Sequence, residues 1–326
     1  MREAPAADTS IRSRCLSARA PCATRAAKLM ATITDWLEAA RPKTLGAAIA
    51  PVLVGTAIGS ALGHTLHVGL AMATLGSCMA LQVATNWFND AIDFIKGSDT
   101  AARVGPRRIT ASGVVTSREV LRAAALMLGV ATLLALPLII ARGWPIIAIG
   151  VPSLYFCYGY TGGPAPLAYR GLGELFVMLF FGLVAVTGAA FVQSGHWHGQ
   201  ALVAGVQIGA LSTVLIAINN LRDIAEDRST GKRTLATRFG ETFARIEITA
   251  LIALAAALGI YWWQIGGALA AWLPSGLLVL AGTPLLRAVW KTPPGPAYNR
   301  FLAAAGALLV GFAVALTAGI GQLPQA

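Results

Sequence analysis

Two polar stretches interrupt an otherwise apolar chain, and both are rich in side chains that bind metal ions and phosphates. The first runs from Asn86 to Arg108 and follows directly on an apolar segment. On a continuing helix Asn86, Asp90 and Asp93 lie at positions i, i+4 and i+7, which share one face, and Asn89 lies four residues before Asp93. Carboxylates gathered in this way repel one another, and a divalent cation that prefers hard oxygen ligands, such as Mg²⁺, removes the repulsion.

A second stretch, residues 219–240, repeats this pattern at the end of a later apolar segment. Its Asn219, Asp223 and Asp227 lie at i, i+4 and i+8. Basic side chains that suit a phosphate group accompany both stretches: Lys96, Arg107 and Arg108 in the first, and Arg222, Lys232 and Arg233 in the second. A solvated loop would explain one such stretch, but two of them indicate a bipartite site for metal ions and a diphosphate.

The composition is that of a helical membrane protein. Of the 326 residues, 56% are hydrophobic and 12% are charged, which is about half the charged fraction of a soluble domain. Nine apolar segments are each long enough to cross the ~30 Å hydrocarbon layer as a helix: 45–63, 68–88, 120–141, 144–160, 173–192, 201–218, 244–263, 267–286 and 301–320. We therefore expect an all-α polytopic membrane protein with about nine transmembrane helices around a central cavity.

The placement of charge predicts the orientation of these helices. If the N-terminus is cytoplasmic, every Lys and Arg except Arg142, and all 14 acidic residues, fall on the cytoplasmic side, in agreement with the positive-inside rule. Both polar stretches then share that side. Because the net charge of +11 follows this alternation, we do not expect nucleic-acid binding.

The regions that flank the first apolar segment carry further expectations. Residues 1–34 are interpreted as a disordered N-terminal tail, and residues 35–322 as one membrane domain. The segment from Trp36 to Lys43 predicts a short interfacial helix broken at Pro42, with Arg41 and Lys43 at the start of the first span. These two bases either anchor the topology or reach the phosphate site.

A group of tyrosines follows the fourth apolar segment, on the same side as the aspartates. Tyr158 and Tyr160 close that segment, and Tyr169, Arg170 and Glu174 lie just beyond it. The rings either form an interfacial aromatic belt or border a site where positive charge develops during a reaction. The four cysteines show no metal-ligand spacing, so neither a zinc site nor a disulfide framework is expected.

At its two polar stretches the chain resembles the UbiA superfamily of intramembrane aromatic prenyltransferases. The pairing of Asn89-Asp90-x-x-Asp93 with a later Asp223-x-x-x-Asp227 is that family's mark. Within the superfamily the chain is most similar to the menaquinone branch, the 1,4-dihydroxy-2-naphthoate polyprenyltransferases. Four sequence segments show this similarity: WLEAARPKTL at 36–45, the stretch from Asn89 through Asp99 to Arg108, YRGLGE at 169–174, and the stretch at 219–240. The chain departs from the superfamily pattern at Gly97, where an aspartate is usual, so the resemblance does not imply a metal contact for Asp99.

The resemblance implies a reaction and a set of site residues. A polyprenyl group would pass from its diphosphate to 1,4-dihydroxy-2-naphthoate with loss of CO₂ and diphosphate, giving demethylmenaquinone. Mg²⁺ would be held by Asp90, Asp93, Asp223 and Asp227, with Asn89 as a helper in catalysis. The substrates would be bound by residues drawn from both stretches and their surroundings: Arg41, Lys43, Asn86, Lys96, Asp99, Arg107, Arg108, Tyr158, Tyr160, Asn219, Arg222, Lys232 and Arg233.

The expected setting is the inner, cytoplasmic membrane of a bacterium, with the site facing the cytoplasm. The expected partners are the two substrates and the lipid bilayer, without an obligate protein partner. Two alternatives stay open: another aromatic acceptor, such as 4-hydroxybenzoate or homogentisate, or a membrane transporter. A transporter places its carboxylates near the membrane midplane, whereas these lie at one side. The length of the prenyl chain is not determined by the sequence.

Overall fold

The computed structural model describes residues 31–98, 105 and 108–323, and every regular element within them is helical. The first part contains α1 (Ile33–Ala39), a 3₁₀ turn (Pro42–Thr44), α2 (Gly46–Leu62), α3 (Val68–Ile95), α4 (Ser117–Arg142) and α5 (Trp144–Gly159). Residues 1–30 of the predicted tail lie outside the described residues, and α1 begins just before the predicted domain boundary at residue 35.

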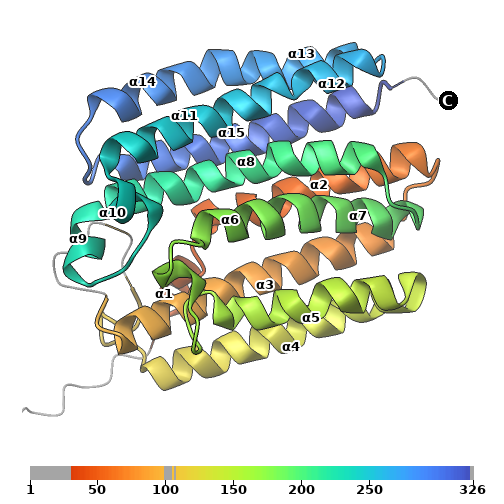
Figure 1. The fold of residues 1–326 in the computed structure, drawn as a ribbon. Coiled ribbons are helices and arrows are strands. Elements are labelled where there is room, and N and C mark those ends of the chain that lie inside the picture. Colours follow the sequence, from red (N-terminus) through yellow and green to blue (C-terminus); the bar gives the residue numbers. More distant parts are fainter. Residues whose placement is uncertain (1–30, 99–104, 106–107, 324–326) are drawn as a thin grey trace, which may run out of the picture.

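The middle part begins with a second 3₁₀ turn (Leu167–Tyr169) and holds α6 (Gly173–Val177), a π-helical segment (Met178–Val184), α7 (Ala185–Ser194), α8 (Gly199–Arg222), α9 (Ile224–Ser229) and α10 (Leu235–Phe239). The last part holds α11 (Glu241–Ala257), α12 (Gly259–Gln264), α13 (Ala268–Leu277), a second π-helical segment (Leu278–Gly282), α14 (Thr283–Lys291) and α15 (Tyr298–Ile320). Figure 1 shows the long helices lying side by side along one common direction.

The apolar segments of the sequence coincide with these helices. Eight helical segments in the described chain are long and apolar enough to cross a membrane. The remaining apolar segment is α5, whose 16 residues extend for about 24 Å, short of the ~30 Å hydrocarbon layer. The all-helical membrane fold is thus confirmed, whereas the count of nine spans and the cytoplasmic N-terminus stay predictions.

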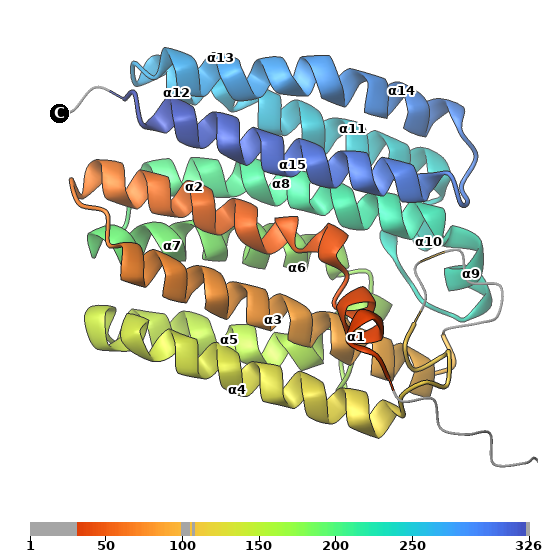
Figure 2. The same ribbon diagram turned by 180° about the vertical axis from the view of Figure 1, so that it is seen from behind.

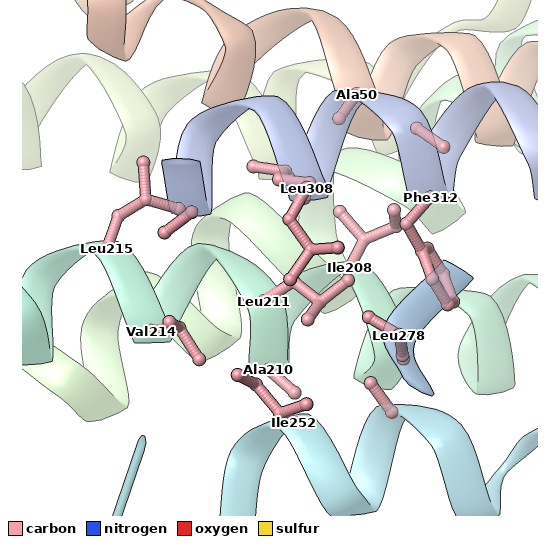
Figure 3. Close-up of a cluster of buried hydrophobic side chains, with 14 of the residues drawn as sticks. Ala50, Ile208, Ala210, Leu211, Val214, Leu215, Ile252, Leu278, Leu308 and Phe312 are labelled. Carbon is pink, nitrogen blue, oxygen red and sulfur yellow. The ribbon is translucent and has the colours of Figure 1, made fainter. Parts of the chain in front are cut away.

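Helix α8 forms the centre of the bundle. Its most apolar window is 78% buried, compared with 17% for that of the outer helix α4. Figures 1 and 2 show α8 between α11 and α15 on one side and α6 and α7 on the other. In Figure 3 its Ile208, Leu211 and Val214 lie among Leu308 and Phe312 of α15 and neighbouring side chains of α2 and α11. Because lipid tails are as apolar as these side chains, close van der Waals packing rather than water exclusion holds such helices together.

Glycines allow two of these contacts to be unusually close. A methyl group at Gly182 would lie 2.4 Å from the carbonyl oxygen of Gly205 in α8. A methyl group at Gly55 of α2 would lie 2.4 Å from the carbonyl oxygen of Val186 in α7. The α6–α7 segment therefore packs backbone to backbone against both α2 and α8, as small residues at membrane helix contacts permit.

The arrangement of the helices brings the two polar stretches to the same end of the bundle. The end of α3 and the short helices α9 and α10 lie at the end where α1 also lies (Figures 1 and 2). The first stretch thus meets the second although more than a hundred residues separate them.

Candidate active site

A cavity of about 700 Å³ opens among these elements and is lined by residues of both polar stretches. Asn86, Asn89 and Asp93 contribute from α3. The opposite contributions come from the end of α8 and from α9: Asn219, Asn220, Asp223, Glu226 and Asp227. Residues of both stretches thus line the same cavity, as a bipartite site would require.

Asp93 is the centre of the first half of the site. It is buried, and Arg108 Nη2 donates to its Oδ2 at 2.8 Å while the Tyr169 hydroxyl donates to its Oδ1 at 2.8 Å. Asn86 beside it donates through Nδ2 to the Ala40 carbonyl at 2.8 Å, which ties α3 to the chain after α1. Both carboxylate oxygens of Asp93 are thus fixed in direction at the cavity wall.

Asp90 occupies a different position. It is 1% exposed and is not among the cavity-lining residues. Its carboxylate accepts the backbone N–H groups of Ile109 and Thr110, each at 3.1 Å, and the Thr110 hydroxyl. This geometry makes Asp90 a support for the segment that carries Arg108, and it does not favour the predicted metal contact.

The second half of the site is built where α8 ends. Asp223 caps α8 with φ −95° and ψ 9°, so α8 ends there and Asp227 lies on the next helix, α9. Arg222 donates to both oxygens of Asp223 at 2.7 Å and to Asn219 Oδ1 at 2.8 Å. Arg222 is buried and absent from the cavity lining, so this geometry favours a role in orienting Asp223 over the predicted contact with a phosphate.

Asp227 has one carboxylate oxygen paired with a lysine and, within the described chain, one without a partner. Lys232 Nζ lies 3.6 Å from its Oδ1, whereas its buried Oδ2 has no partner among the described residues. Burial raises the pKa of Asp227 to about 6, and Lys232 opposes that rise. A carboxylate held in this way favours a cation at the cavity.

Tyr169 joins the two halves and was not among the predicted site residues. Its hydroxyl bonds to Asp93, and its ring centroid lies 4.2 Å from Lys96 Nζ and 5.9 Å from Lys232 Nζ. Two ammonium groups near one ring are attracted by its π face. Lys96 also donates to the Thr161 carbonyl at 2.6 Å, and burial lowers the pKa of Lys96 against the pull of Asp93. Tyr169 begins the segment YRGLGE that resembles the menaquinone branch, but the sequence alone did not show which of the tyrosines in this region would reach the site.

The other predicted substrate-binding residues divide into two groups. Arg41, Asn86, Arg108, Tyr160, Asn219 and Lys232 line the cavity. Tyr158 does not line the cavity. It precedes Tyr160 by two residues, and residues two apart on a helix point about 200° apart. Its side chain is 43% exposed and packs on Phe88, with the ring centroids 5.6 Å apart. Arg233 is exposed, and Lys96 turns toward Tyr169, so neither is a lining residue. Asp99, Arg107 and the side chain of Lys43 lie outside the described residues.

The donor set suits Mg²⁺ bound together with a phosphate. Within the described residues, no three His, Cys, Asp or Glu side chains gather closely enough to hold a metal by themselves. Mg²⁺ is usually bound by one or two carboxylates and completed by phosphate oxygens and water, not by an all-protein cage. The oxygens of Asp93, Asp223 and Asp227 around one cavity, with the partnerless Oδ2 of Asp227, fit that pattern.

A second, apolar cavity adjoins the first. It has a volume of about 290 Å³ and extends between α3, α4, α5 and the α6–α7 segment. It shares five lining residues with the polar cavity: Ala47, Gln82, Thr85, Phe176 and Phe181. A ligand with a charged head and an apolar chain could therefore occupy both.

Comparison with known proteins identifies the family of the chain. The sequence profile of the UbiA prenyltransferase family matches residues 48–312. The chain belongs to this family. The 1,4-dihydroxy-2-naphthoate octaprenyltransferase of Mycobacterium tuberculosis is 39% identical to it over 70% of this chain and 78% of the relative. The enzyme of the same name from Mycobacterium leprae is 34% identical over 89% of this chain and 97% of the relative.

A solved structure shares the fold. The UbiA homolog from Archaeoglobus fulgidus bound to GPP and Mg²⁺ has a TM-score of 0.65 to this chain, covering 88% of it and 99% of that chain. At 17% identity this likeness concerns the fold alone. The resemblance to the UbiA superfamily and its menaquinone branch, drawn from the motifs, is confirmed by the profile and the relatives.

Proposed function

We propose that this UbiA-family chain transfers a polyprenyl group from polyprenyl diphosphate to 1,4-dihydroxy-2-naphthoate. The observation that carries the proposal is the meeting of both aspartate stretches at one polar cavity that adjoins an apolar one. The choice of acceptor is supported by five curated bacterial relatives, 34–39% identical, each named as a 1,4-dihydroxy-2-naphthoate octaprenyltransferase.

In this proposal the diphosphate lies between the two halves of the site. Asp93, Asp223 and Asp227, with Asn89 and Asn219 beside them, would hold Mg²⁺, which when bound neutralises the departing diphosphate. Arg41, Arg108 and Lys232 line the same cavity and supply further positive charge to the phosphate oxygens. Arg222, Tyr169 and Asp90 act through these groups by fixing Asp223, Asp93 and the segment at Arg108, respectively.

The apolar part of the molecule receives the prenyl chain and protects the reaction. The allylic C–O bond breaks, and its electron pair leaves with the diphosphate. The ring carbon that bears the carboxylate then forms the new C–C bond, and loss of CO₂ returns an electron pair to the ring, which gives the quinol form of demethylmenaquinone. Tyr160, Phe176 and Phe181 line the cavity with aromatic rings that favour the allylic cation and keep out water.

We also propose the setting in the cell. Residues 35–322 form the membrane domain, and the cavity faces the cytoplasm of a bacterium across its inner membrane. The concentration of Lys, Arg and acidic residues on one side of the predicted topology supports this orientation. Chemical labelling of single cysteines placed at residue 64 and residue 229 in intact cells would test it, since only the former should react from outside.

The function is tested by prenyl transfer with the purified protein. With Mg²⁺ and a polyprenyl diphosphate, product and CO₂ should form from the naphthoate and not from 4-hydroxybenzoate. Asp227→Asn should lower turnover by about 100-fold or more, because the Mg²⁺ that would neutralise the leaving diphosphate loses an anionic ligand. Glu241→Gln, which alters a half-exposed glutamate paired with Arg245 and outside the cavity lining, is the matched control and should keep full activity. Product from 4-hydroxybenzoate alone would refute the proposed acceptor. No product from either compound would favour the alternative function, a membrane transporter.

A further inference from the structure

Glu174 lies in the cavity wall, outside both aspartate stretches, and one of its carboxylate oxygens lacks a partner. The residue is 5% exposed and is the second residue of α6. Oε1 accepts a hydrogen bond from Asn220 Nδ2 at 2.7 Å, which fixes the carboxylate. Oε2 is buried and meets no donor in the part of the chain that the structure describes. An unsatisfied buried carboxylate oxygen is costly, so a donor from a ligand would stabilise this arrangement.

Two further polar atoms in the wall of the same cavity are also buried and lack a hydrogen-bond partner among the described residues. They are Ser212 Oγ of α8 and Gln82 Oε1 of α3. The carboxylate and the amide oxygen can only accept hydrogen bonds, and the hydroxyl can do either. A fully ionised diphosphate offers only acceptors and negative charge, and is therefore the wrong ligand for the two oxygens that can only accept, those of Glu174 and Gln82. A ligand that donates from hydroxyl groups is the right one.

The surroundings of Glu174 also favour a flat aromatic ligand. Tyr160 and Phe176 line the cavity with ring centroids 5.5 Å apart. Tyr160 packs against the backbone next to Glu174, since a methyl group at Gly173 would lie 2.9 Å from its hydroxyl oxygen. Aromatic rings stack or pack edge to face on such walls, and each contact adds to simple burial. The same part of the cavity thus offers both ring surfaces and hydrogen-bond acceptors.

We propose that Glu174 Oε2 accepts a hydrogen bond from a ring hydroxyl of the aromatic acceptor, with Ser212 as a second contact. This inference rests on the proposed function, in which the acceptor is a naphthalene that carries two hydroxyl groups. It assigns Glu174 as a specificity-determining residue that touches the acceptor and not the prenyl diphosphate. A hydrogen bond to a charged oxygen is roughly twice as strong as one between neutral groups, so Glu174→Gln should weaken acceptor binding about tenfold.

The test compares variants against acceptor analogues that lack one hydroxyl group. The variants are Glu174→Gln and Ser212→Ala, with Glu241→Gln as the control. For each we would measure KM for 1,4-dihydroxy-2-naphthoate and for the polyprenyl diphosphate, and the inhibition constants of 1-hydroxy-2-naphthoate and 4-hydroxy-2-naphthoate. Wild type should bind the dihydroxy compound better than at least one analogue. Glu174→Gln should lose that preference and raise KM for the acceptor alone.

Ser212→Ala keeps the proposal testable if Glu174→Gln does not fold. Ser212 Oγ has no hydrogen bond to lose within the described chain, so a rise in acceptor KM there reports a contact with the ligand. Unchanged acceptor KM and unchanged preference in both variants would overturn this assignment while prenyl transfer stands. Equal rises in KM for both substrates would show a structural role and overturn it as well. No transfer by wild type would overturn the proposed function and this assignment with it.

Discussion

The position of Asp90 leads to a prediction that separates support from metal binding. In the wild type, Asp90 Oδ2 accepts a hydrogen bond from the backbone N–H of Ile109 at 3.1 Å. In Asp90→Asn an amide nitrogen takes the place of that oxygen. That N–H group would lose its acceptor and face a donor. Asp227→Asn is the matched comparison, because Asp227 lines the cavity and contacts Lys232 instead.

The magnitude follows from the buried hydrogen bond. A buried backbone donor left without a partner costs about 1–3 kcal/mol. Since every 1.4 kcal/mol is a factor of ten, local opening around Ile109 and Thr110 should become roughly 5- to 150-fold more frequent. Arg108, the neighbour of Ile109, would then hold Asp93 less firmly, and turnover should fall while the Mg²⁺ requirement stays near that of wild type.

Hydrogen exchange and metal titration together measure this difference. Exchange of a peptide that contains Ile109 and Thr110 should be faster in Asp90→Asn and unchanged in Asp227→Asn. The Mg²⁺ concentration for half-maximal activity should rise in Asp227→Asn and remain similar in Asp90→Asn. If Asp90→Asn instead left exchange unchanged and raised the Mg²⁺ requirement as Asp227→Asn does, the supporting role would be refuted and Asp90 would be a ligand.

Two further substitutions test the site and the packing. Tyr169→Phe removes the 2.8 Å bond to Asp93 but keeps the ring, so kcat should fall about tenfold or more, as expected for loss of a hydrogen bond to a charged group; unchanged kcat would contradict the role given to the hydroxyl. Gly182→Ala places a methyl group 2.4 Å from the Gly205 carbonyl oxygen and should destabilise the protein by about 1–3 kcal/mol, seen as a lower Tm in detergent. Gly129→Ala, where no atom lies within 4 Å of the new methyl group, should keep the Tm of wild type, and equal Tm values for the two variants would argue against the close contact.

The sequence by itself determined the membrane class and the two halves of the site. The length of an apolar segment and the side on which charge accumulates are local properties, so the helices could be placed to within a few residues. The repeated spacing of Asn and Asp at two segment ends was also readable, because each motif lies within a few residues of chain. These signals sufficed to name the family and to predict a metal-assisted diphosphate site.

Only the tertiary structure decided which of these side chains face the cavity. Asp90 and Asp93 point only about 60° apart on α3, yet the segment at Ile109 covers one of them and leaves the other at the wall. In the same way Arg222 turns to Asp223, Tyr158 turns outward, and Tyr169 and Glu174 join the site from between the two stretches. Orientation depends on what packs against a residue from distant parts of the chain, and a pattern of neighbours in sequence does not contain that information.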